Sequence, residues 1–361
     1  MKQKTTKILF SLLLLLMLNG CGYAGPEKAV RQELELIKKL DDSTVETFLA
    51  YESSHLTGSD TAEITEEATE AVKLFFQNFK YRIRSSSVSD DETSASVVVD
   101  ITNLDARALA KDLCRLMISR STLLESREDS GNSLAFSFAL MKECLESHTY
   151  EQVTTSVTVP LIHQDDLWQI QDTAELQDQL AGGLASSLAD PYLLTPEEVL
   201  DIRLAPFCDF TGEDWISYLN IQDIFHLGTD LSSQIDAALA QQIASYFEYE
   251  ILSSTQDQDT AAVTVRITSL DLESVINQCR TELLDYAGTT ESIRATDEEL
   301  NQKTSEILLN SLVSNQSSAA KEVSVTMINN GYTWETALND SFVDALLGGV
   351  SEAISQLTTA D

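Results

Sequence analysis

The 361-residue sequence predicts an α+β fold of two tandem repeats, each a curved four-stranded antiparallel sheet packed against helices. Three observations predict it. One series of landmarks occurs twice in the same order, at an offset that drifts from about 170 to about 166 residues. Apolar residues alternate with polar ones in two hairpin-like stretches of each copy. Between these stretches, apolar residues recur every three or four positions, which is typical of helices.

The landmarks of the repeat include proline, tryptophan and paired glycines, which chance rarely places in one order. Pro26-Glu27 returns as Pro196-Glu197, Phe79–Ile83 as Phe247–Ile251, Ile101–Asp105 as Ile267–Asp271, Trp168 as Trp334, and Gly182-Gly183 as Gly348-Gly349. Two small deletions in the second copy account for the drift in offset. We therefore place the first repeat at residues 26–190, a linker at 191–194 and the second repeat at 195–361.

Each repeat is expected to open with helices. Residues 29–51 and 65–78 carry apolar side chains at helical spacing in the first repeat, as do residues 196–204 and 230–246 in the second. Pro196 suits the first turn of a helix because it has no backbone N–H to satisfy, and Thr195 suits the N-cap.

A hairpin follows in each repeat, around residues 79–101 and 247–267. Its alternation indicates one buried and one exposed face. On the exposed face, Arg82 should lie opposite Asp100, and Glu250 opposite Arg266. The signs are exchanged between the copies but the pairing is kept, which predicts a cross-strand ion pair in each repeat.

A helix beginning near Asp105 or Asp271, a polar loop and a further helix over 133–146 or 297–313 should come next. A second hairpin contains Trp168 or Trp334 on its last strand, and in the second repeat its turn contains Asn330-Gly331, a strong hairpin signal. A final helix over 176–188 or 342–354 would hold a glycine pair in its interior. Each such glycine costs about 1 kcal/mol relative to alanine, so something should compensate.

Helices before a sheet that ends in a tryptophan-bearing strand resemble the nuclear transport factor 2-like (cystatin-like) fold. That resemblance implies a conical cavity between sheet and helices but no particular function. The helical pair between the hairpins departs from the simplest version of this fold. The residues expected to line such cavities are Trp168, Gly182, Gly183, Trp334, Gly348 and Gly349. The alternatives are that the tryptophans are core residues and that the glycines let a helix pack closely on the sheet.

The N-terminus consists of a lysine-bearing start, an apolar run over residues 8–18 and the segment Leu18-Asn19-Gly20-Cys21. The run is short for a bilayer span. The segment resembles the lipobox of bacterial lipoprotein signals. The resemblance implies a signal peptide over 1–20, removal of which exposes Cys21, and acylation of Cys21, with residues 21–25 as a tether. It places the protein on the extracytoplasmic face of the cell membrane.

The remaining chain is strongly acidic. The only charged residues among the first 20 are lysines. Removal of residues 1–20 therefore leaves 20 basic and 58 acidic residues. Nucleic acid is therefore excluded as a partner by repulsion. The four remaining cysteines, Cys114, Cys144, Cys208 and Cys279, show no metal-ligand spacing, although a Cys114–Cys144 disulfide is an alternative to buried thiols. No metal or cofactor is expected.

These patterns favour a lipid-anchored, non-enzymatic cell-envelope protein whose tandem domains bind a protein partner or a small ligand. No GxSxG or HExxH motif occurs, and an acid–base pair of Asp100 with His163 has no support beyond residue type. One alternative is a structural envelope spacer, which cavities filled by side chains would favour. Another is a cavity-based acid/base enzyme, which a buried, unpaired carboxylate would favour.

Overall fold

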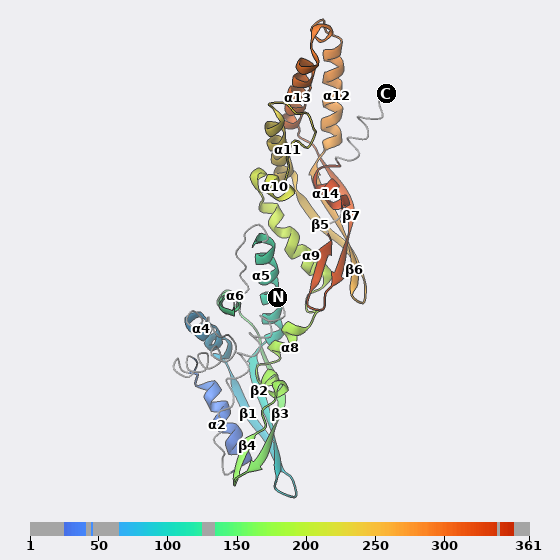
Figure 1. Ribbon diagram of the computed structural model, residues 1–361. Helices are drawn as coiled ribbons and strands as arrows, with labels where there is room; N and C mark the ends of the chain where they lie inside the picture. The colour runs from blue at the N-terminus through green and yellow to red at the C-terminus, as the bar shows by residue number, and fades with distance from the viewer. Residues whose placement is uncertain (1–24, 41–44, 46–64, 125–133, 338–339, 350–361) are drawn as a thin grey trace. The chain divides into compact units, whose positions relative to one another are not determined.

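The computed structural model describes residues 25–40, 45, 65–124, 134–337 and 340–349. The chain divides into two compact units, residues 1–193 and 194–361. Each unit contains one four-stranded antiparallel sheet with helices packed on it (Figure 1). The predicted α+β class with two such sheets is therefore confirmed.

Unit 1 alternates helices and hairpins in the predicted order. Its elements are α2 (Pro26–Lys38), α4 (Thr65–Phe76), β1 (Lys80–Val88), β2 (Ser94–Leu104), α5 (Ala106–Leu124), α6 (Leu134–Ser147), β3 (Gln152–Gln164), β4 (Leu167–Ile170), α7 (Ala174–Leu180) and α8 (Leu184–Ala189). The predicted first helix, 29–51, extends beyond Leu40 into a segment that, apart from Val45, lies outside the described residues.

Unit 2 follows the same order of helices and hairpins. Its elements are α9 (Pro196–Leu204), η2 (Ala205–Asp209), α10 (Gly212–Leu219), α11 (Ser232–Tyr246), β5 (Glu248–Asp257), β6 (Thr260–Leu270), α12 (Leu272–Ala287), η3 (Ser292–Arg294), α13 (Asp297–Ser314), β7 (Ser318–Asn329), β8 (Trp334–Ala337) and α14 (Asp340–Leu346). Thr195 caps α9 in a capping box with Glu198, and Pro196 occupies the first turn as predicted.

The two sheets have the same topology, β1-β2-β3-β4 and β5-β6-β7-β8. Their registers also correspond: Ala95 pairs with Leu161 in unit 1, and Ala261 with Met327 in unit 2. One face of each sheet forms the core, because its alternate residues are buried. In β2 and β6 these residues are Ala95, Val97, Val99, Ile101, Ala261, Val263, Val265 and Ile267.

The first hairpin of each unit contains a β-bulge that the simple alternation did not reveal. The register shifts between Ile83 and Ser85 in β1, and between Ile251 and Ser253 in β5. A bulge inserts one extra residue, which bends the strand and re-aims the side chains around it. The bulge occurs at the same place in both copies, so it belongs to the repeated unit.

Both predicted cross-strand positions are opposite each other, Arg82 to Asp100 and Glu250 to Arg266. The ion pair of Arg266 with Glu250 is confirmed, and Arg266 also reaches Glu322 on β7 at 3.1 Å. In unit 1 the prediction that Asp100 forms an ion pair with Arg82 is wrong. Arg84, the extra residue of the bulge, places its Nε 3.0 Å from Asp100 Oδ2.

The first helix of each unit packs on the sheet in the same way. Helix α2 contacts β1, β2 and β4, and α9 contacts β5, β6 and β8. A tyrosine hydroxyl from the first strand supports each helix. Tyr81 donates to Glu35 Oε1 at 2.8 Å, and Tyr249 donates to Asp201 Oδ1 at 2.7 Å. The position of α2 over the sheet of unit 1 is thereby fixed.

Candidate functional site

The two tryptophans predicted to floor cavities lie in the cores of their units. Trp168 on β4 is 7% exposed, and its indole stacks on the His163 imidazole with ring centroids 4.5 Å apart. Trp334 at the start of β8 is 1% exposed. That Trp168 and Trp334 each form the floor of a ligand cavity remains a prediction.

The predicted final helix with glycines in its interior is wrong, because the glycines end a helix. Gly182 and Gly183 follow α7 with φ of +69° and +77°, and Gly348 and Gly349 follow α14 with +70° and +83°. Gly183 N–H donates to the Asp178 carbonyl at 2.8 Å and Gly182 N–H to the Gln179 carbonyl at 3.1 Å. This is a Schellman motif, whose left-handed residues favour glycine. A new helix, α8, then starts at Leu184.

The glycine turns also approach the sheet closely. A Cβ on Gly348 would lie 2.4 Å from the Leu270 carbonyl oxygen, where β6 ends, and one on Gly182 would lie 3.8 Å from the Leu104 carbonyl oxygen, where β2 ends, and 3.3 Å from Ala106 Cβ on α5. Both contacts fit the alternative that the glycines allow backbone packing. A ligand wall formed by these turns remains a prediction.

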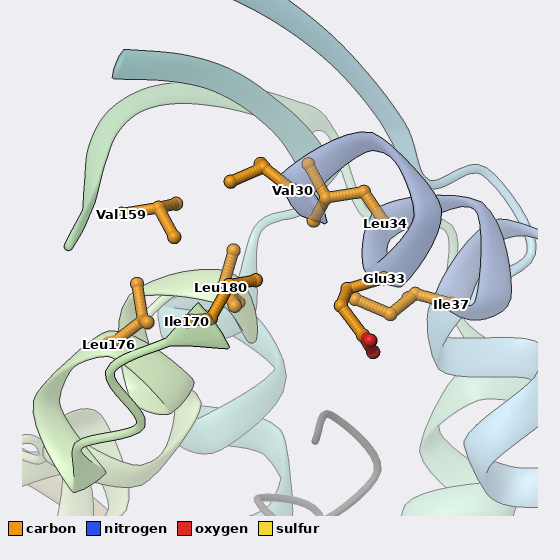
Figure 2. Close-up of a pocket in the computed structure, with 8 residues that line it drawn as sticks. All are labelled: Val30, Glu33, Leu34, Ile37, Val159, Ile170, Leu176 and Leu180. Atoms are coloured by element: carbon orange, nitrogen blue, oxygen red, sulfur yellow. The ribbon is translucent and has the colours of Figure 1, made fainter. Parts of the chain in front are cut away.

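A pocket lies elsewhere in unit 1, between α2 and the end of the sheet (Figure 2). Helix α2 contributes one side, and β3, β4 and α7 contribute the other. The lining residues are Val30, Glu33, Leu34, Ile37, Val159, Ile170, Leu176 and Leu180. None of the six residues predicted to line a cavity is among them. The hollow measures about 280 Å³ with its open mouth included, and its enclosed part has room for about one water molecule.

Glu33 is the one ionisable residue in the described lining of this pocket. The residue is 7% exposed, but its carboxylate oxygens are not among the described buried atoms that lack a hydrogen-bond partner. Burial among aliphatic side chains raises the pKa of Glu33 to about 7, because the charged form loses hydration. The group can therefore exist as acid or as carboxylate near neutral pH.

Glu35, two residues along the same helix, shows how a hydrogen-bond partner changes the pKa of a carboxyl group. The hydrogen bond from the Tyr81 hydroxyl is the largest cause that lowers the pKa of Glu35. Glu35 is thus held as a carboxylate by a partner, whereas burial shifts the pKa of Glu33 in the opposite direction. The sequence did carry a signal for Glu33, because it interrupts the apolar stripe of Val30, Leu34 and Ile37 at helical spacing.

The equivalent positions of unit 2 carry different side chains. Arg203 stands at the position of Glu33, Phe207 at that of Ile37 and Phe342 at that of Leu176, by the offsets of the repeat. Phe207 is 3% exposed and Phe342 is 0% exposed. Phe342 and Leu176 hold the same place in α14 and α7, whereas Phe207 lies in η2 and packs against Trp215 and Phe247.

Other candidate groups are not brought together. Asp100 pairs with Ser156 across the β2–β3 ladder and with Arg84 by charge, whereas His163 stacks on Trp168 near the opposite end of β3. Cys114, Cys144, Cys208 and Cys279 are free thiols. Among the residues that the structure describes, no three His, Cys, Asp or Glu side chains are grouped to hold a metal ion.

The predicted acylation site, Cys21, lies outside the described residues. None of the described helices combines the length and hydrophobicity that crossing a membrane requires.

No protein-family model matches the chain, and no curated protein matches it. Among solved structures, the crystal structure of YcdA, a proposed lipoprotein of Bacillus subtilis, is similar to this chain. It is 12% identical, the match covers 75% of this chain and 96% of YcdA, and the TM-score is 0.27.

Proposed function

We propose that the chain is a lipid-anchored, non-enzymatic protein of the cell envelope that binds a small ligand or a protein partner through its α+β units. The observation that carries the anchoring is the segment Leu18–Cys21 behind a lysine-bearing, apolar leader. The acidic remainder of the chain suits a protein held near a membrane surface without adhering to anionic head groups.

The pocket of unit 1 supports small-ligand binding more than catalysis. Seven of its lining residues are Val, Leu or Ile, and Glu33 is the single polar group of the described lining. Acid–base catalysis usually needs a second positioned group, to orient the substrate or to stabilise developing charge. A lining of this kind binds an apolar group and recognises one polar feature.

A cavity-based acid/base enzyme is the second candidate, and Glu33 is the specific observation that favours it. A buried carboxyl with a pKa of about 7 is suited to proton transfer at neutral pH. A buried carboxyl group is what we expect in a cavity-based acid/base enzyme. A reaction would require a further polar group beside Glu33, and the described lining contains none.

Anchoring is tested by fractionating cells that express the wild-type chain or Cys21→Ser. The wild-type protein should stay with the membranes through high-salt and alkaline washes, because acyl chains rather than charges hold it. Cys208→Ser provides the matched control, because it removes an exposed cysteine outside the signal. Equal wash resistance of Cys21→Ser and the wild type would contradict the proposal.

A further inference from the structure

We propose that two copies of the chain pair through the open edge of β3, which joins their unit 1 sheets into one continuous antiparallel sheet. This deepens the proposed function and rests on its protein-partner arm, because it names a second copy as the partner. Strand β3 runs from Gln152 to Gln164, whereas β4 pairs with Leu161–Gln164. Among the described strands, the first part of β3 therefore has a neighbour, β2, on one side only.

The backbone bonds of β3 show which residues face the open edge. His163 N–H donates to the Thr93 carbonyl beside β2, so the odd-numbered residues of β3 point toward β2. The Pro160 carbonyl accepts from Gln171 just beyond β4, so the even-numbered residues point the other way. The even-numbered residues of the open part are Gln152, Thr154, Ser156 and Thr158. In the described part of the chain, no backbone group bonds to their outward N–H and C=O groups.

This open edge lacks the features that usually prevent an edge strand from pairing, which are charged side chains, proline and bulges. Residues 152–158 contain neither a charge nor a proline, and their register with β2 is regular. By contrast, β1 at the other edge of the sheet has a bulge and carries Lys80, Arg82 and Arg84. The open part of β3 is therefore suited to accept another strand.

A second copy of β3 is complementary to this edge. A two-fold axis at Thr155 would set Thr154 opposite Ser156 of the other copy, so that outward-pointing backbone groups meet in hydrogen-bonded pairs. The same register would place Val153, which is 43% exposed, beside Val157 of the other copy and cover it. The paired segment is uncharged, so the copies meet without local repulsion, although their net charge of −35 opposes their approach at long range.

Unit 2 carries charges at the same edge. By the matching strand registers, Lys321 and Glu322 of β7 stand where unit 1 has Thr155 and Ser156. Both are held in ion pairs within unit 2. The same two-fold pairing would set Lys321 against Lys321, and like charges directly opposite each other destabilise a strand pair. We therefore expect pairing through unit 1 and not through unit 2.

The first test is sedimentation velocity of the full chain over a series of concentrations, at low and at high ionic strength. Detergent micelles are kept in large excess, so that two chains share a micelle only by associating. The test variant is Thr155→Lys, which installs the residue that the second copy already has at this place. The matched control is Ser85→Lys, which adds the same charge at an exposed position of β1.

The second test is disulfide cross-linking in membranes, with Thr155→Cys and Ser85→Cys in a Cys208→Ser background. Cys208 is replaced because it is the exposed thiol among the described cysteines. At the two-fold axis, Thr155 would form a non-hydrogen-bonded pair with itself, with Cα atoms about 4.5 Å apart. That separation lies within the range that a disulfide spans.

We expect a monomer–dimer equilibrium that Thr155→Lys weakens by about tenfold or more, because like charges meet at the axis. Ser85→Lys should leave the equilibrium near that of the wild type. Higher ionic strength should strengthen the dimer, because salt screens the repulsion between acidic copies. Thr155→Cys should cross-link on oxidation, and Ser85→Cys should not.

A chain that stays monomeric under all these conditions would overturn the proposal and leave the edge to an extended segment of another protein. A dimer that both lysine variants weaken equally, or equal cross-linking of both cysteine variants, would also overturn it, because the contact would then lie elsewhere. Each of these results leaves the anchoring of Cys21 untouched, so failure of this proposal and failure of the proposed function are distinguishable.

Discussion

The carboxyl group of Glu33 lies among aliphatic side chains, and burial raises its pKa to about 7 in the folded unit, against an ordinary value of 4.5. The raised pKa means that the folded state binds the proton more tightly than the unfolded state does. Stability from this group is fully present below pH 4.5 and is lost as the pH rises through 7. Unit 1 should therefore become less stable between these values.

Glu33→Gln should remove that dependence. Gln cannot ionise, so at pH 8 the variant should be more stable than the wild type by roughly 1–3 kcal/mol, since water at the pocket mouth screens part of the effect. At pH 4 the two proteins should differ little. Urea denaturation at both pH values measures this. A variant that is equally stabilised or destabilised at both values would show that ionisation of Glu33 does not destabilise the fold.

The landmarks of the repeat could be predicted from the sequence, but the burial of Glu33 could not. An acidic residue within an apolar helical stripe usually lies at its edge, and only the placement of α2 against β4 shows that this one is buried. Arg84 is a similar case. The alternation of polar and apolar residues predicts that Asp100 forms its ion pair with Arg82. The ion pair is with Arg84 instead, because the bulge inserts that residue into β1, and the hydrophobic pattern does not reveal the bulge.

At the scale of elements, the order of helices and strands followed from periodicity, since strands and helices bury side chains at different intervals. The interruption between α7 and α8 could not be predicted from periodicity. Leucine spacing continues through Gly182 and Gly183 as though one helix ran on, while the left-handed backbone ends it. These glycines would be costly inside a helix, and the fold avoids that cost by placing them at its end.

The turn after α14 gives a prediction about glycine. Gly348→Ala should destabilise unit 2 by more than the roughly 1–2 kcal/mol of a left-handed alanine, because its Cβ would lie 2.4 Å from the Leu270 carbonyl oxygen. Gly331→Ala is the matched control: it has φ of +85° with nothing within 4 Å of the new Cβ. Urea denaturation compares the two free energies of unfolding. Equal losses would mean that the close approach to β6 is absent.

At the scale of the whole molecule, duplication explains why two units share topology, register and bulge position. Shared architecture with exchanged charges at Arg82/Glu250 and Glu33/Arg203 indicates that the copies kept the fold and diverged in their surfaces and interiors. A site in one unit therefore need not occur in the other. The repeat is visible in the sequence because its anchors are aromatic and glycine residues that the fold requires at fixed places.

The central claim is that Cys21 becomes an acylated N-terminus, and the mass of the N-terminal peptide from the membrane-bound protein tests it most directly. We predict a peptide that begins at Cys21 and carries the mass of a diacylglyceryl group, with residues 1–20 removed. A peptide that begins at Cys21 without lipid, or one that retains residues 1–20 with an unmodified Cys21, would contradict it.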